Sequence, residues 1–428
     1  MSAGTLPRII SGIPTHGFMS FEEHQAIHGT TPVLPPRREG SALEMEVARS
    51  GLRGHGGAAF PTAIKLHAVA RARGRAVVVA NGCDGEPASS KDRLLLARLP
   101  HLVLDGALLA ARAVGARDIV IAVSEGLDRT ERAIGVAISE RPDLRRGGPQ
   151  VRVAVVGEGY VSGQETALVN FLGGGPAKPT AVPPRVFERG VGGRPTLVQN
   201  VETLAQVALI ARHGAAWFRE LGTPEDPGSR LVSVTGAVAH PGVYEIENGA
   251  PLSGLLAAAG GAPVALQAFL LGGYAGTWVD PARGMSLALS ETELTKAGTT
   301  LGAGVVVALP TSACAVAEIV SVAEWLSVQS AGQCGPCVNG LGAIAATLQH
   351  LQHGSAGAAP IERLRHWASL VRGRGACAHP DGVAGLVTSA LDLFGAEFAD
   401  HALHGACEAC ARRRILPLSA PRPRRLAA

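Results

Sequence analysis

Three continuous apolar runs of strand length are the feature that most limits how this chain can fold. They read RAVVVAN (75–81), RDIVIAV (117–123) and VRVAVVG (151–157), and helix-like segments such as HLVLDGALLAARAV lie between them. Strands that are apolar along their whole length are typical of parallel sheets with both faces covered. The pattern therefore predicts an α/β fold over the first half of the chain, to about residue 225.

The rest of the sequence divides into parts of different character. After a Pro/Gly/acidic linker around 222–229, short alternating strands and a small helix predict a compact α+β module. From about 313 to 403, apolar residues recur at three- and four-residue spacing and predict four helices. We therefore expect an α/β domain (1–228), an α+β module (229–310), a four-helix bundle (311–413) and a basic flexible tail (414–428).

Composition narrows the class of protein. Hydrophobic residues make up 46% and charged residues 17%, so the chain can bury a sizeable core. Aromatic residues are scarce at 4% whereas glycines number 55, which favours glycine loops and disfavours a nucleic-acid-binding protein. The N-terminus lacks a signal-peptide pattern, and the most apolar window is interrupted by Pro310 and Glu318. We expect a cytoplasmic protein without a transmembrane segment.

A glycine-rich block, GHGGAAFPTAIK, is the first element that suggests chemistry. Gly54, Gly56 and Gly57 precede a predicted helix that carries Lys65. Backbone N–H groups in such a loop can approach a phosphate, and both the helix N-terminus and the ammonium group favour negative charge. A nucleotide or flavin phosphate would fit, although a flexible surface turn explains the same block equally well.

Three further blocks follow predicted strands or begin helices. NGCDGEPASSKDR places Asn81, Asp84 and Glu86 at the carboxyl end of a strand, where α/β sheets bind ligands, or else it forms a solvated loop. GYVSGQETAL also follows a strand, and PTLVQNVET places Asn200 and Glu202 at a helix start, where they could simply cap the helix.

In order and spacing, these blocks resemble a family of flavoproteins, the 51-kDa, NADH-oxidising components of respiratory NADH:quinone oxidoreductase and their relatives in NAD-linked hydrogenases and formate dehydrogenases. The family's GRGGAGFPTGxKW, NADExEPGxxKDR, GxYxCGEETAL and PTxVNNVET are similar to GHGGAAFPTAIKL, NGCDGEPASSKDR, GYVSGQETAL and PTLVQNVET here. Residues 229–310 resemble its ubiquitin-like soluble-ligand-binding (SLBB) β-grasp domain, and the last helices resemble its cluster-bearing bundle. The resemblance covers nearly the whole chain and implies a Rossmann-like FMN/NADH domain at its start.

The resemblance also implies cofactors and site residues. FMN would be held by the glycine loop, Asn81 and Asn200, NADH would stack on its ring, and hydride would pass from nicotinamide C4 to flavin N5. FMN accepts two electrons as hydride and releases them singly to an iron–sulfur cluster. The implied catalytic residues are Glu86 and Glu165, and the implied cofactor-binding residues are Gly54, Gly56, Gly57, Phe60, Lys65, Asn81, Asp84, Glu86 and Asn200.

Four positions in these blocks depart from the family pattern. The family's Asp and Glu are replaced by Cys83 and Asp84, its first Glu of GEET by Gln164, and its first Asn of VNNVET by Gln199. The pocket thus loses negative charge, which we expect to raise the flavin potential or to relax the bias against NADPH.

Cysteines define a second candidate site. The family binds a 4Fe–4S cluster through C-x2-C-x2-C and a fourth cysteine about 40 residues later. Here Ala331 stands at the first position, and Cys334, Cys337 and Cys377 match the other three. Seven cysteines without an export signal favour ligands over disulfides.

Several outcomes for this site remain open. One is a cluster with a substitute fourth ligand, for which the candidates are His379, Ser330, water, Cys407 or Cys410. A three-iron or labile cluster is a variant of it. The others are zinc bound by Cys334, Cys337, Cys377 and His379, loss of metal, and a redox dithiol at Cys334 and Cys337.

Three further cysteines lie outside this set, and two of them, Cys407 and Cys410, have no counterpart in the family. Cys407 and Cys410, in CEAC, predict a second half-site, a site shared with a partner, or surface thiols. Cys314 lies on the apolar face of a predicted helix, and we expect it in the core.

The function that follows is an FMN-dependent NAD(P)H dehydrogenase that passes electrons to a cluster and then to an acceptor. That acceptor would be a ferredoxin, a thioredoxin-like 2Fe–2S subunit or a quinone-linked partner, the last of which would associate the protein with a membrane complex. The altered cluster position favours a stand-alone or two-component reductase. A non-catalytic scaffold, a zinc-stabilised paralogue and a cluster-free diaphorase are the alternatives. The sequence leaves the choice of NADH or NADPH and the oligomeric state open.

Overall fold

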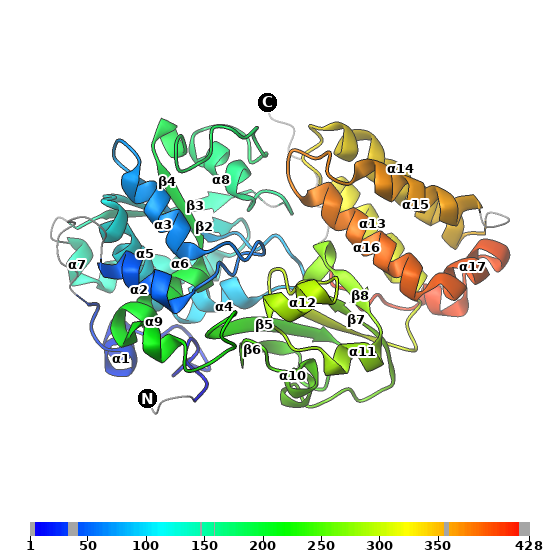
Figure 1. The fold of residues 1–428 in the computed structure, drawn as a ribbon, viewed down its shortest axis with the longest axis horizontal. Helices are drawn as coiled ribbons and strands as arrows, with labels where there is room; N and C mark the ends of the chain where they lie inside the picture. The colour runs from blue at the N-terminus through cyan, green and yellow to red at the C-terminus, as the bar shows by residue number, and fades with distance from the viewer. Residues whose placement is uncertain (1–4, 33–41, 146–147, 158, 355–358, 419–428) are drawn as a thin grey trace.

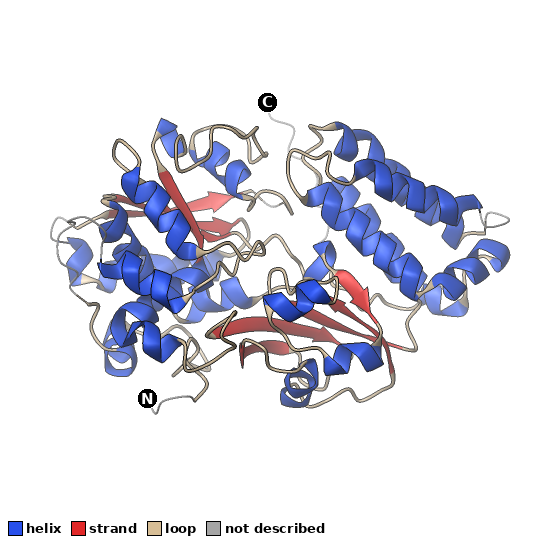
Figure 2. Cartoon of the chain, viewed as in Figure 1, coloured by secondary structure: helices blue, strands red, loops and turns tan. Residues whose placement is uncertain are grey.

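The computed structural model describes residues 5–32, 42–145, 148–157, 159–354 and 359–418. Figure 1 shows three parts in chain order: a parallel sheet with its helices, a second sheet, and a group of C-terminal helices. Figure 2 shows helices in all three parts and strands gathered in the two sheets, with many loops between them. The expected basic tail is described only as far as residue 418.

The first sheet has four strands in the order β3-β2-β1-β4, and all neighbours are parallel. This mixed α/β architecture with a parallel sheet agrees with the prediction. The apolar runs form three of its strands. On the edge strand β3, Gln150 and Arg152 are exposed. The inner strands β1 and β2 are apolar on both faces, because both of their faces are covered. The strands are β1 (Val77–Gly82), β2 (Asp118–Ser124), β3 (Gln150–Val156) and β4 (Thr196–Asn200).

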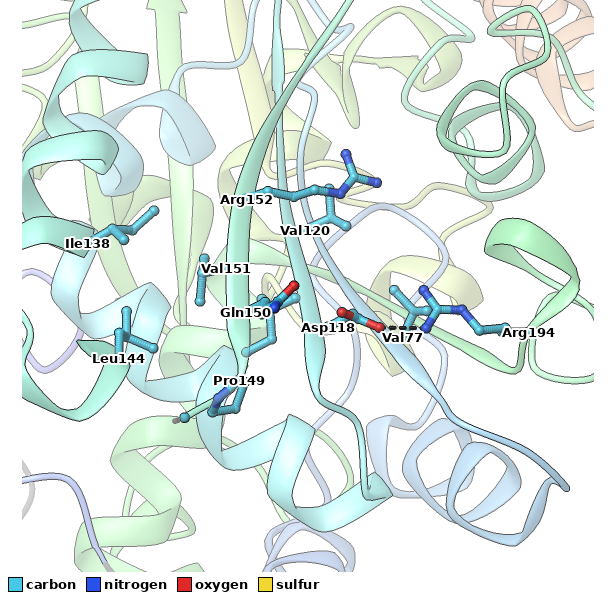
Figure 3. A pocket seen from close by; sticks show the side chains of 12 residues that line it. Val77, Asp118, Val120, Ile138, Leu144, Pro149, Gln150, Val151, Arg152 and Arg194 are labelled. Atoms are coloured by element: carbon cyan, nitrogen blue, oxygen red, sulfur yellow. Dashed lines mark hydrogen bonds and ion pairs between the residues drawn. The ribbon is translucent and has the colours of Figure 1, made fainter. Parts of the chain in front are cut away.

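A cavity of about 670 Å³ lies at the amino ends of β1, β2 and β3. Figure 3 shows Val77, Asp118 and Gln150 at its wall, with Asp118 paired to Arg194. Parallel α/β sheets bind ligands at the opposite, carboxyl end of their strands. The four sequence blocks also lie away from this cavity, so it is not the candidate site.

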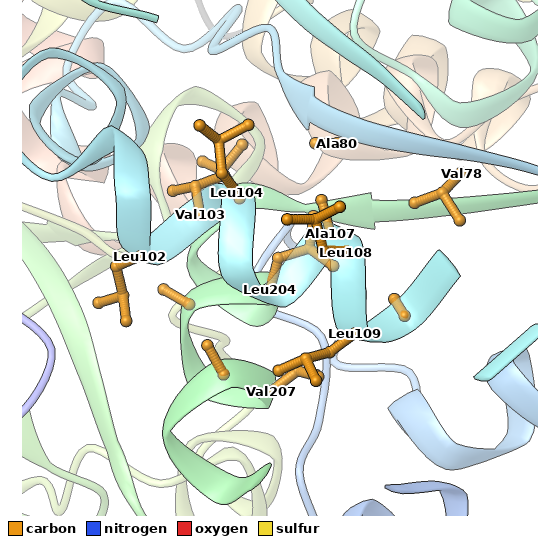
Figure 4. Close-up of a cluster of buried hydrophobic side chains, with 14 of the residues drawn as sticks. Val78, Ala80, Leu102, Val103, Leu104, Ala107, Leu108, Leu109, Leu204 and Val207 are labelled. Carbon is orange, nitrogen blue, oxygen red and sulfur yellow. The ribbon is translucent and has the colours of Figure 1, made fainter. Parts of the chain in front are cut away.

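Helices cover both faces of the first sheet. Helices α5 and α9 pack against Val78 and Ala80 of β1, as Figure 4 shows, while α8 packs against the other face. A Cβ on Gly106 would lie 1.9 Å from the carbonyl oxygen of Leu204, so only glycine permits α5 and α9 to approach this closely. The helices of this part are α1 (Phe21–His28), α2 (Ala42–Ser50), α3 (Thr62–Arg71), α4 (Lys91–Arg98), α5 (Pro100–Val114), α6 (Asp128–Glu140), α7 (Pro142–Arg145), α8 (Glu165–Leu172) and α9 (Val201–Phe218).

The second sheet has five strands in the order β6-β5-β9-β7-β8. Only β5 and β9 pair in parallel, and the other neighbours are antiparallel. One face packs on α10 and the other packs on α13, so this sheet joins the first part to the C-terminal helices. Its elements are β5 (Ser229–Gly236), β6 (Gly242–Glu247), α10 (Leu252–Ala258), β7 (Leu266–Leu271), β8 (Thr277–Val279), α11 (Pro281–Ser286), α12 (Glu291–Lys296) and β9 (Val305–Pro310).

The C-terminal part differs from the prediction in its last helix. The pattern over 313–403 predicts four helices, but the chain bends by 85° near Phe394 and forms two helices, α16 and α17, at the end of this part. Cys334 lies in the loop after α13, and a π-helical turn, Pro336–Gly340, leads into α14. The helices are α13 (Ala315–Val328), α14 (Leu341–Gln352), α15 (Ala359–Val371), α16 (His379–Leu393) and α17 (Gly395–His404).

The first residues of the expected flexible tail are docked on the protein. The backbone N–H groups of Ile415 and Leu416 donate to the carboxylate of Glu318 at 2.8 and 3.0 Å, and Leu416 is buried. The prediction of flexibility is therefore wrong for 414–418, because a carboxylate on α13 satisfies the backbone there. Residues 419–428 lie outside the described residues.

Within the described ranges, no single helix is long and apolar enough to cross a membrane. Two sharply bent pairs, α4 with α5 and α16 with α17, meet the length and composition criteria only when each pair is taken together.

Candidate functional site

A cavity of about 760 Å³ opens at the carboxyl ends of β1 and β4. All four sequence blocks line it, although they come from segments far apart in the chain. The second sheet contributes Gly272, Ala275 and Thr300, and the segment before and within α16 contributes Cys377 and His379. Because the cavity lies where parallel sheets bind ligands and gathers the predicted residues, it is the candidate site.

The glycine loop forms one wall of this cavity. Its ends are tied together, since the N–H group of Gly54 donates to the carbonyl of Phe60 at 2.8 Å. A Cβ on Gly56 would lie 3.3 Å from Cβ of Asn200, and Gly57 has a φ of +113°, which side chains rarely allow. Glycine is thus needed at both positions for the loop to lie against the start of α9.

Two residues at the end of this loop are unusual. Ala59 has a φ of +47°, so a residue with a Cβ adopts the left-handed conformation where the family pattern has glycine. Phe60 lines the cavity and is 45% exposed, although large aromatic side chains are normally buried. An exposed ring at the wall offers a stacking surface for a flat ligand.

Lys65 and Glu165 meet across the cavity. Nζ of Lys65 lies 2.7 Å from Oε1 of Glu165, and both side chains are about one-third exposed. Lys65 also approaches the carbonyl of Val198 on β4, at 3.4 Å. The first and third blocks are therefore joined by an ion pair that remains accessible from the cavity.

The two asparagines of the predicted site are already engaged by the protein. The side-chain amide of Asn81 donates to the carbonyl of Gly163 at 2.8 Å, and its oxygen accepts from the N–H group of Cys83 at 3.2 Å. Asn200 caps α9 by accepting from the N–H group of Glu202 at 2.9 Å, which confirms the helix-cap interpretation. Both residues shape the cavity wall.

Glu86 is buried at the junction between the first part of the chain and the second sheet. Its carboxylate accepts from the N–H groups of Tyr274 at 2.8 Å and of Ala88 at 3.3 Å, and it also hydrogen-bonds with Tyr160. Burial raises the pKa of Glu86 to about 8, although these hydrogen bonds lower it. Tyr274 is fully buried, so its side chain serves packing at this junction.

Near neutral pH, Cys83 is uncharged and Asp84 is only partly ionised. Burial, and then the charge of Asp92, raise the pKa of Asp84 to about 7, although the hydroxyl of Ser89 donates to it at 2.7 Å. Burial and the neighbouring carboxylates raise the pKa of the Cys83 thiol to about 12. The cavity thus presents a neutral thiol and a partly protonated carboxyl group at these two positions.

Lys91 anchors a buried charge network that sequence reasoning missed. Its ammonium group lies 2.7 Å from Asp92 and 2.9 Å from Glu202, and the side chain is almost fully buried. Glu202 accepts in turn from the N–H group of Leu231 on β5, and Asp92 accepts from Asn200. The solvated-loop alternative for this segment is therefore wrong. The KDR and VET motifs contain these charged residues, but the sequence does not show that Lys91 pairs with Glu202.

The two glutamine substitutions behave differently. Oε1 of Gln164 caps α8 by accepting from the N–H groups of Thr166 and Ala167. Nε2 of Gln199 is buried and has no hydrogen-bond partner in the part of the chain that the structure describes. Gln199 is also one of the residues that line the cavity, so this unpaired amide lies close to the candidate site.

The three predicted metal ligands lie at one end of the helical part. The Cys334 thiol accepts from backbone N–H groups of Ala376 and Cys337, which lower its pKa although burial raises it. Burial and the nearby Cys334 raise the pKa of the Cys337 thiol to about 12. Cys377 precedes α16 and lines the large cavity, so the three thiols lie beside the candidate site.

Two residues bear on the fourth ligand position of the cluster: the candidate His379, and Ala331, which stands in place of the family's first cysteine. Nε2 of His379 faces the carbonyl of Leu326 at 2.9 Å, while Nδ1 is buried and lacks a partner among the described residues. The zinc set of Cys334, Cys337, Cys377 and His379 is not among the groups, in the described ranges, whose ligand atoms all lie within 4.8 Å. Ala331 offers a methyl group, which cannot bind iron.

Cys407 and Cys410 do not join this site. Their thiols group instead with Cys314 and His401, and Cys314 stands at the opposite end of α13 from the loop with Cys334. The proposal that either supplies the fourth cluster ligand is therefore wrong. Cys314 is buried, as expected, but it is more than a core residue because its thiol faces these partners.

Comparison with known proteins places this geometry in a family. A family model described as the Nuo51 FMN-binding domain matches residues 47–209, and the NADH-ubiquinone oxidoreductase-F iron-sulfur binding region matches 317–401. An SLBB domain matches 231–271. These matches, together with the cavity, define a flavin- and iron–sulfur-binding oxidoreductase of the NADH dehydrogenase type.

Individual relatives point to the same family. The F 2 subunit of NADH-quinone oxidoreductase of Rhizobium meliloti (strain 1021) is 32% identical over 378 residues, which cover 84% of this chain and 89% of that protein. The corresponding F subunit of Escherichia coli (strain K12) is 31% identical over 371 residues, 82% of each. The chain belongs to the family of NADH-quinone oxidoreductase F subunits, the NADH-oxidising flavoproteins that the sequence motifs predicted.

Solved structures share the fold. Crystal structures of an NAD+-reducing NiFe-hydrogenase in the H2-reduced and air-oxidized states match with TM-scores of 0.77 and 0.75, each at 30% identity. The matches cover 85% and 87% of this chain. The chain spans only 63% and 66% of the hydrogenase chains, which are therefore longer.

Proposed function

We propose that the large cavity binds FMN and NADH, and that the chain oxidises NADH and passes electrons singly to an iron–sulfur cluster beside the cavity. One observation carries the proposal: all four sequence blocks and Cys377 line a single cavity. When bound, FMN would supply the conversion from a two-electron hydride donor to one-electron acceptors. The protein's part is to hold, orient and shield the reactants.

Phosphate binding falls to the glycine loop. Glycines at positions 56 and 57 would let a phosphate approach the backbone of the loop, and the N-terminus of α3, which follows the loop, would favour its negative charge. Lys65 would neutralise phosphate charge, with Glu165 fixing the position of its ammonium group. Gln199 would satisfy its buried amide with a ring acceptor of the flavin.

The other candidates divide into contacting and positioning groups. Phe60 offers its exposed ring for stacking with NADH. Glu165 is the carboxylate that remains accessible, so it is the stronger candidate for direct contact. Glu86, Asn81 and Asn200 use their polar atoms within the protein, and we assign them to shaping the pocket.

The domain organisation supports electron transfer out of the cavity. We propose that residues 229–310 form a β-grasp SLBB module and that 311–413 form a cluster-bearing bundle after the Rossmann-like domain of residues 1–228. Cys334, Cys337 and Cys377 would hold the cluster, with the fourth ligand supplied from outside this set. A ferredoxin or a thioredoxin-like 2Fe–2S subunit as acceptor, and a cytoplasmic location, stay predictions.

Anaerobic purification followed by visible spectroscopy tests the function. Flavin bands and a broad iron–sulfur absorbance that both bleach with NADH are expected. Flavin without iron would indicate a cluster-free diaphorase, and a colourless protein would indicate a scaffold. Gly56→Val should abolish flavin retention, because its side chain meets Asn200, whereas Gly135→Val, on the open surface of α6, should retain flavin. Full flavin content in Gly56→Val would show that the phosphate site is misplaced.

A further inference from the structure

A second group of potential metal ligands lies away from the candidate site and plays no part in the proposed function. Cys314 comes from the start of α13, His401 from α17, and Cys407 and Cys410 from the segment that follows α17. The ligand atoms of all four lie within 4.8 Å of one another. Three of the four residues fall outside 317–401, the stretch that matches the family's iron-sulfur region.

The spacing of the four ligand atoms fits one tetrahedral ion. Sγ of Cys314 lies 3.4 Å from Nε2 of His401 and 3.4 Å from Sγ of Cys410, which lies 3.7 Å from Sγ of Cys407. Tetrahedral Zn²⁺, with bonds of about 2.3 Å to sulfur and 2.0–2.1 Å to nitrogen, places neighbouring ligand atoms about 3.5–3.8 Å apart. These sulfur atoms are also too far apart for a disulfide bond.

An iron–sulfur cubane fits this group poorly. Each thiolate of a 4Fe–4S cluster binds a different iron, so its ligands are more widely spread than those of a single ion. The group is also distant from Cys334 and Cys337. Cys314 precedes α13 and those cysteines follow it, and the 14 residues of α13 span about 21 Å.

Several neighbouring groups favour thiolates here, although the carboxylate of Glu397 also contacts Cys314. Cys314 is the N-cap of α13, where the N–H group of Ala317 donates to its sulfur at 3.3 Å and the helix end favours negative charge. Three thiolates and one neutral imidazole around Zn²⁺ carry a net charge of −1. Arg412 and Arg414 bracket the group by donating to the carbonyls of Ser312 and Cys410, at 2.9 and 3.1 Å.

We propose that Cys314, His401, Cys407 and Cys410 bind one structural Zn²⁺ that fastens the C-terminal segment to α13. The C-x2-C spacing of Cys407 and Cys410 is that of zinc knuckles, and four protein ligands close the coordination sphere. The same segment then continues to Leu416, which is buried and held by Glu318, and to Pro417, whose carbonyl accepts from the hydroxyl of Tyr274.

Elemental analysis of the full-length protein, anaerobically purified with zinc and iron supplied and then dialysed against a mild chelator, tests this site. The wild type should hold about one zinc per chain. The Cys407→Ser/Cys410→Ser double variant should lose that zinc yet keep its iron and flavin. The matched Cys334→Ser/Cys337→Ser double variant should lose iron and keep zinc. Because zinc and iron are measured separately, a failure of the zinc site can be told apart from a failure of the proposed function.

Cobalt substitution of the wild type tests the same site if Cys407→Ser/Cys410→Ser fails to fold. Wild-type protein produced with Co²⁺ in place of zinc should show the intense thiolate and tetrahedral ligand-field bands of a sulfur-rich site. Three results for the wild type would overturn the assignment: absence of zinc, a disulfide between Cys407 and Cys410, or iron bound at these residues. Undiminished zinc in Cys407→Ser/Cys410→Ser would overturn it as well.

Discussion

Nζ of Lys65 lies 2.7 Å from Oε1 of Glu165, although 100 residues separate the two in the sequence. Lys65 projects from α3 and Glu165 begins α8, so the pair closes the cavity between the glycine loop and the third block. Both side chains remain partly exposed. An ammonium group has three N–H donors, so Lys65 can keep Glu165 as a partner and also donate to a phosphate, which makes this pair the natural place to test ligand binding.

Lys65→Ala is expected to weaken nucleotide or flavin binding by about 1.5–3 kcal/mol, the usual contribution of a hydrogen bond to a charged group. That range corresponds to a loss of about tenfold or more in affinity. Flavin titration of the apoprotein and kcat/KM for NADH would measure it. Lys296→Ala, which removes an exposed ion pair with Glu293, is the control and should change neither quantity.

Glu86→Gln is expected to flatten the pH dependence of stability. The pKa of Glu86 is raised to about 8 by burial, whereas an unfolded glutamate titrates near 4.3. Between about pH 5 and 8 the folded state therefore binds more protons than the unfolded state, and the free energy of unfolding falls as pH rises. The limit for one full proton is about 1.4 kcal/mol per pH unit.

Thermal unfolding of wild type and Glu86→Gln across this pH range would measure the difference. Asp84, whose pKa is raised to about 7, should leave part of the slope in the variant. Glu293→Gln changes an exposed carboxylate and is the control. A wild-type slope that survives unchanged in Glu86→Gln would contradict the prediction.

Cys83→Asp is expected to shift cofactor preference toward NADH. The thiol of Cys83 is neutral because its pKa is raised to about 12, so aspartate would restore the carboxyl group of the family pattern at the cavity. Added negative charge disfavours the extra phosphate of NADPH. The ratio of kcat/KM for NADPH to that for NADH should fall several-fold, while Cys83→Ser should leave it unchanged.

Ala59→Gly is expected to stabilise the protein slightly. A residue with a Cβ costs roughly 1–2 kcal/mol in the left-handed conformation that Ala59 adopts, which outweighs the greater unfolded-state entropy of glycine. Chemical denaturation would show a higher midpoint. Ala58→Gly, one residue earlier and without a positive φ, should instead lower it. Equal effects of the two variants would show that Ala59 carries no strain.

Gly106→Ala is expected to destabilise the core by at least about 1–3 kcal/mol, because the added methyl group would overlap the carbonyl of Leu204. The backbones of α5 and α9 must then move apart. Gly342→Ala on α14, where a Cβ meets open space, should stabilise by about 0.5–1 kcal/mol. Denaturant midpoints of the two variants should move in opposite directions.

Local patterns were readable from the sequence. Three apolar runs predicted strands of the parallel sheet, and the glycine loop, Glu165 and Asn200, which the motifs brought together, line one cavity. The strand β4 was missed, because its short PTLVQN run was taken only as the approach to a helix. The bend near Phe394 was also missed, because apolar spacing continues through it.

The sequence by itself determined three strands of the first sheet, the order of the four blocks and the spacing of the cysteines proposed for the cluster, because each depends on periodicity or on motifs along the chain. The tertiary structure decided which distant side chains meet. Lys91 pairs with Glu202, far along the chain, and Cys314 meets Cys410 at a separation of 96 positions, through packing of whole helices and strands. Such contacts depend on how elements stack, and no local pattern carries that information.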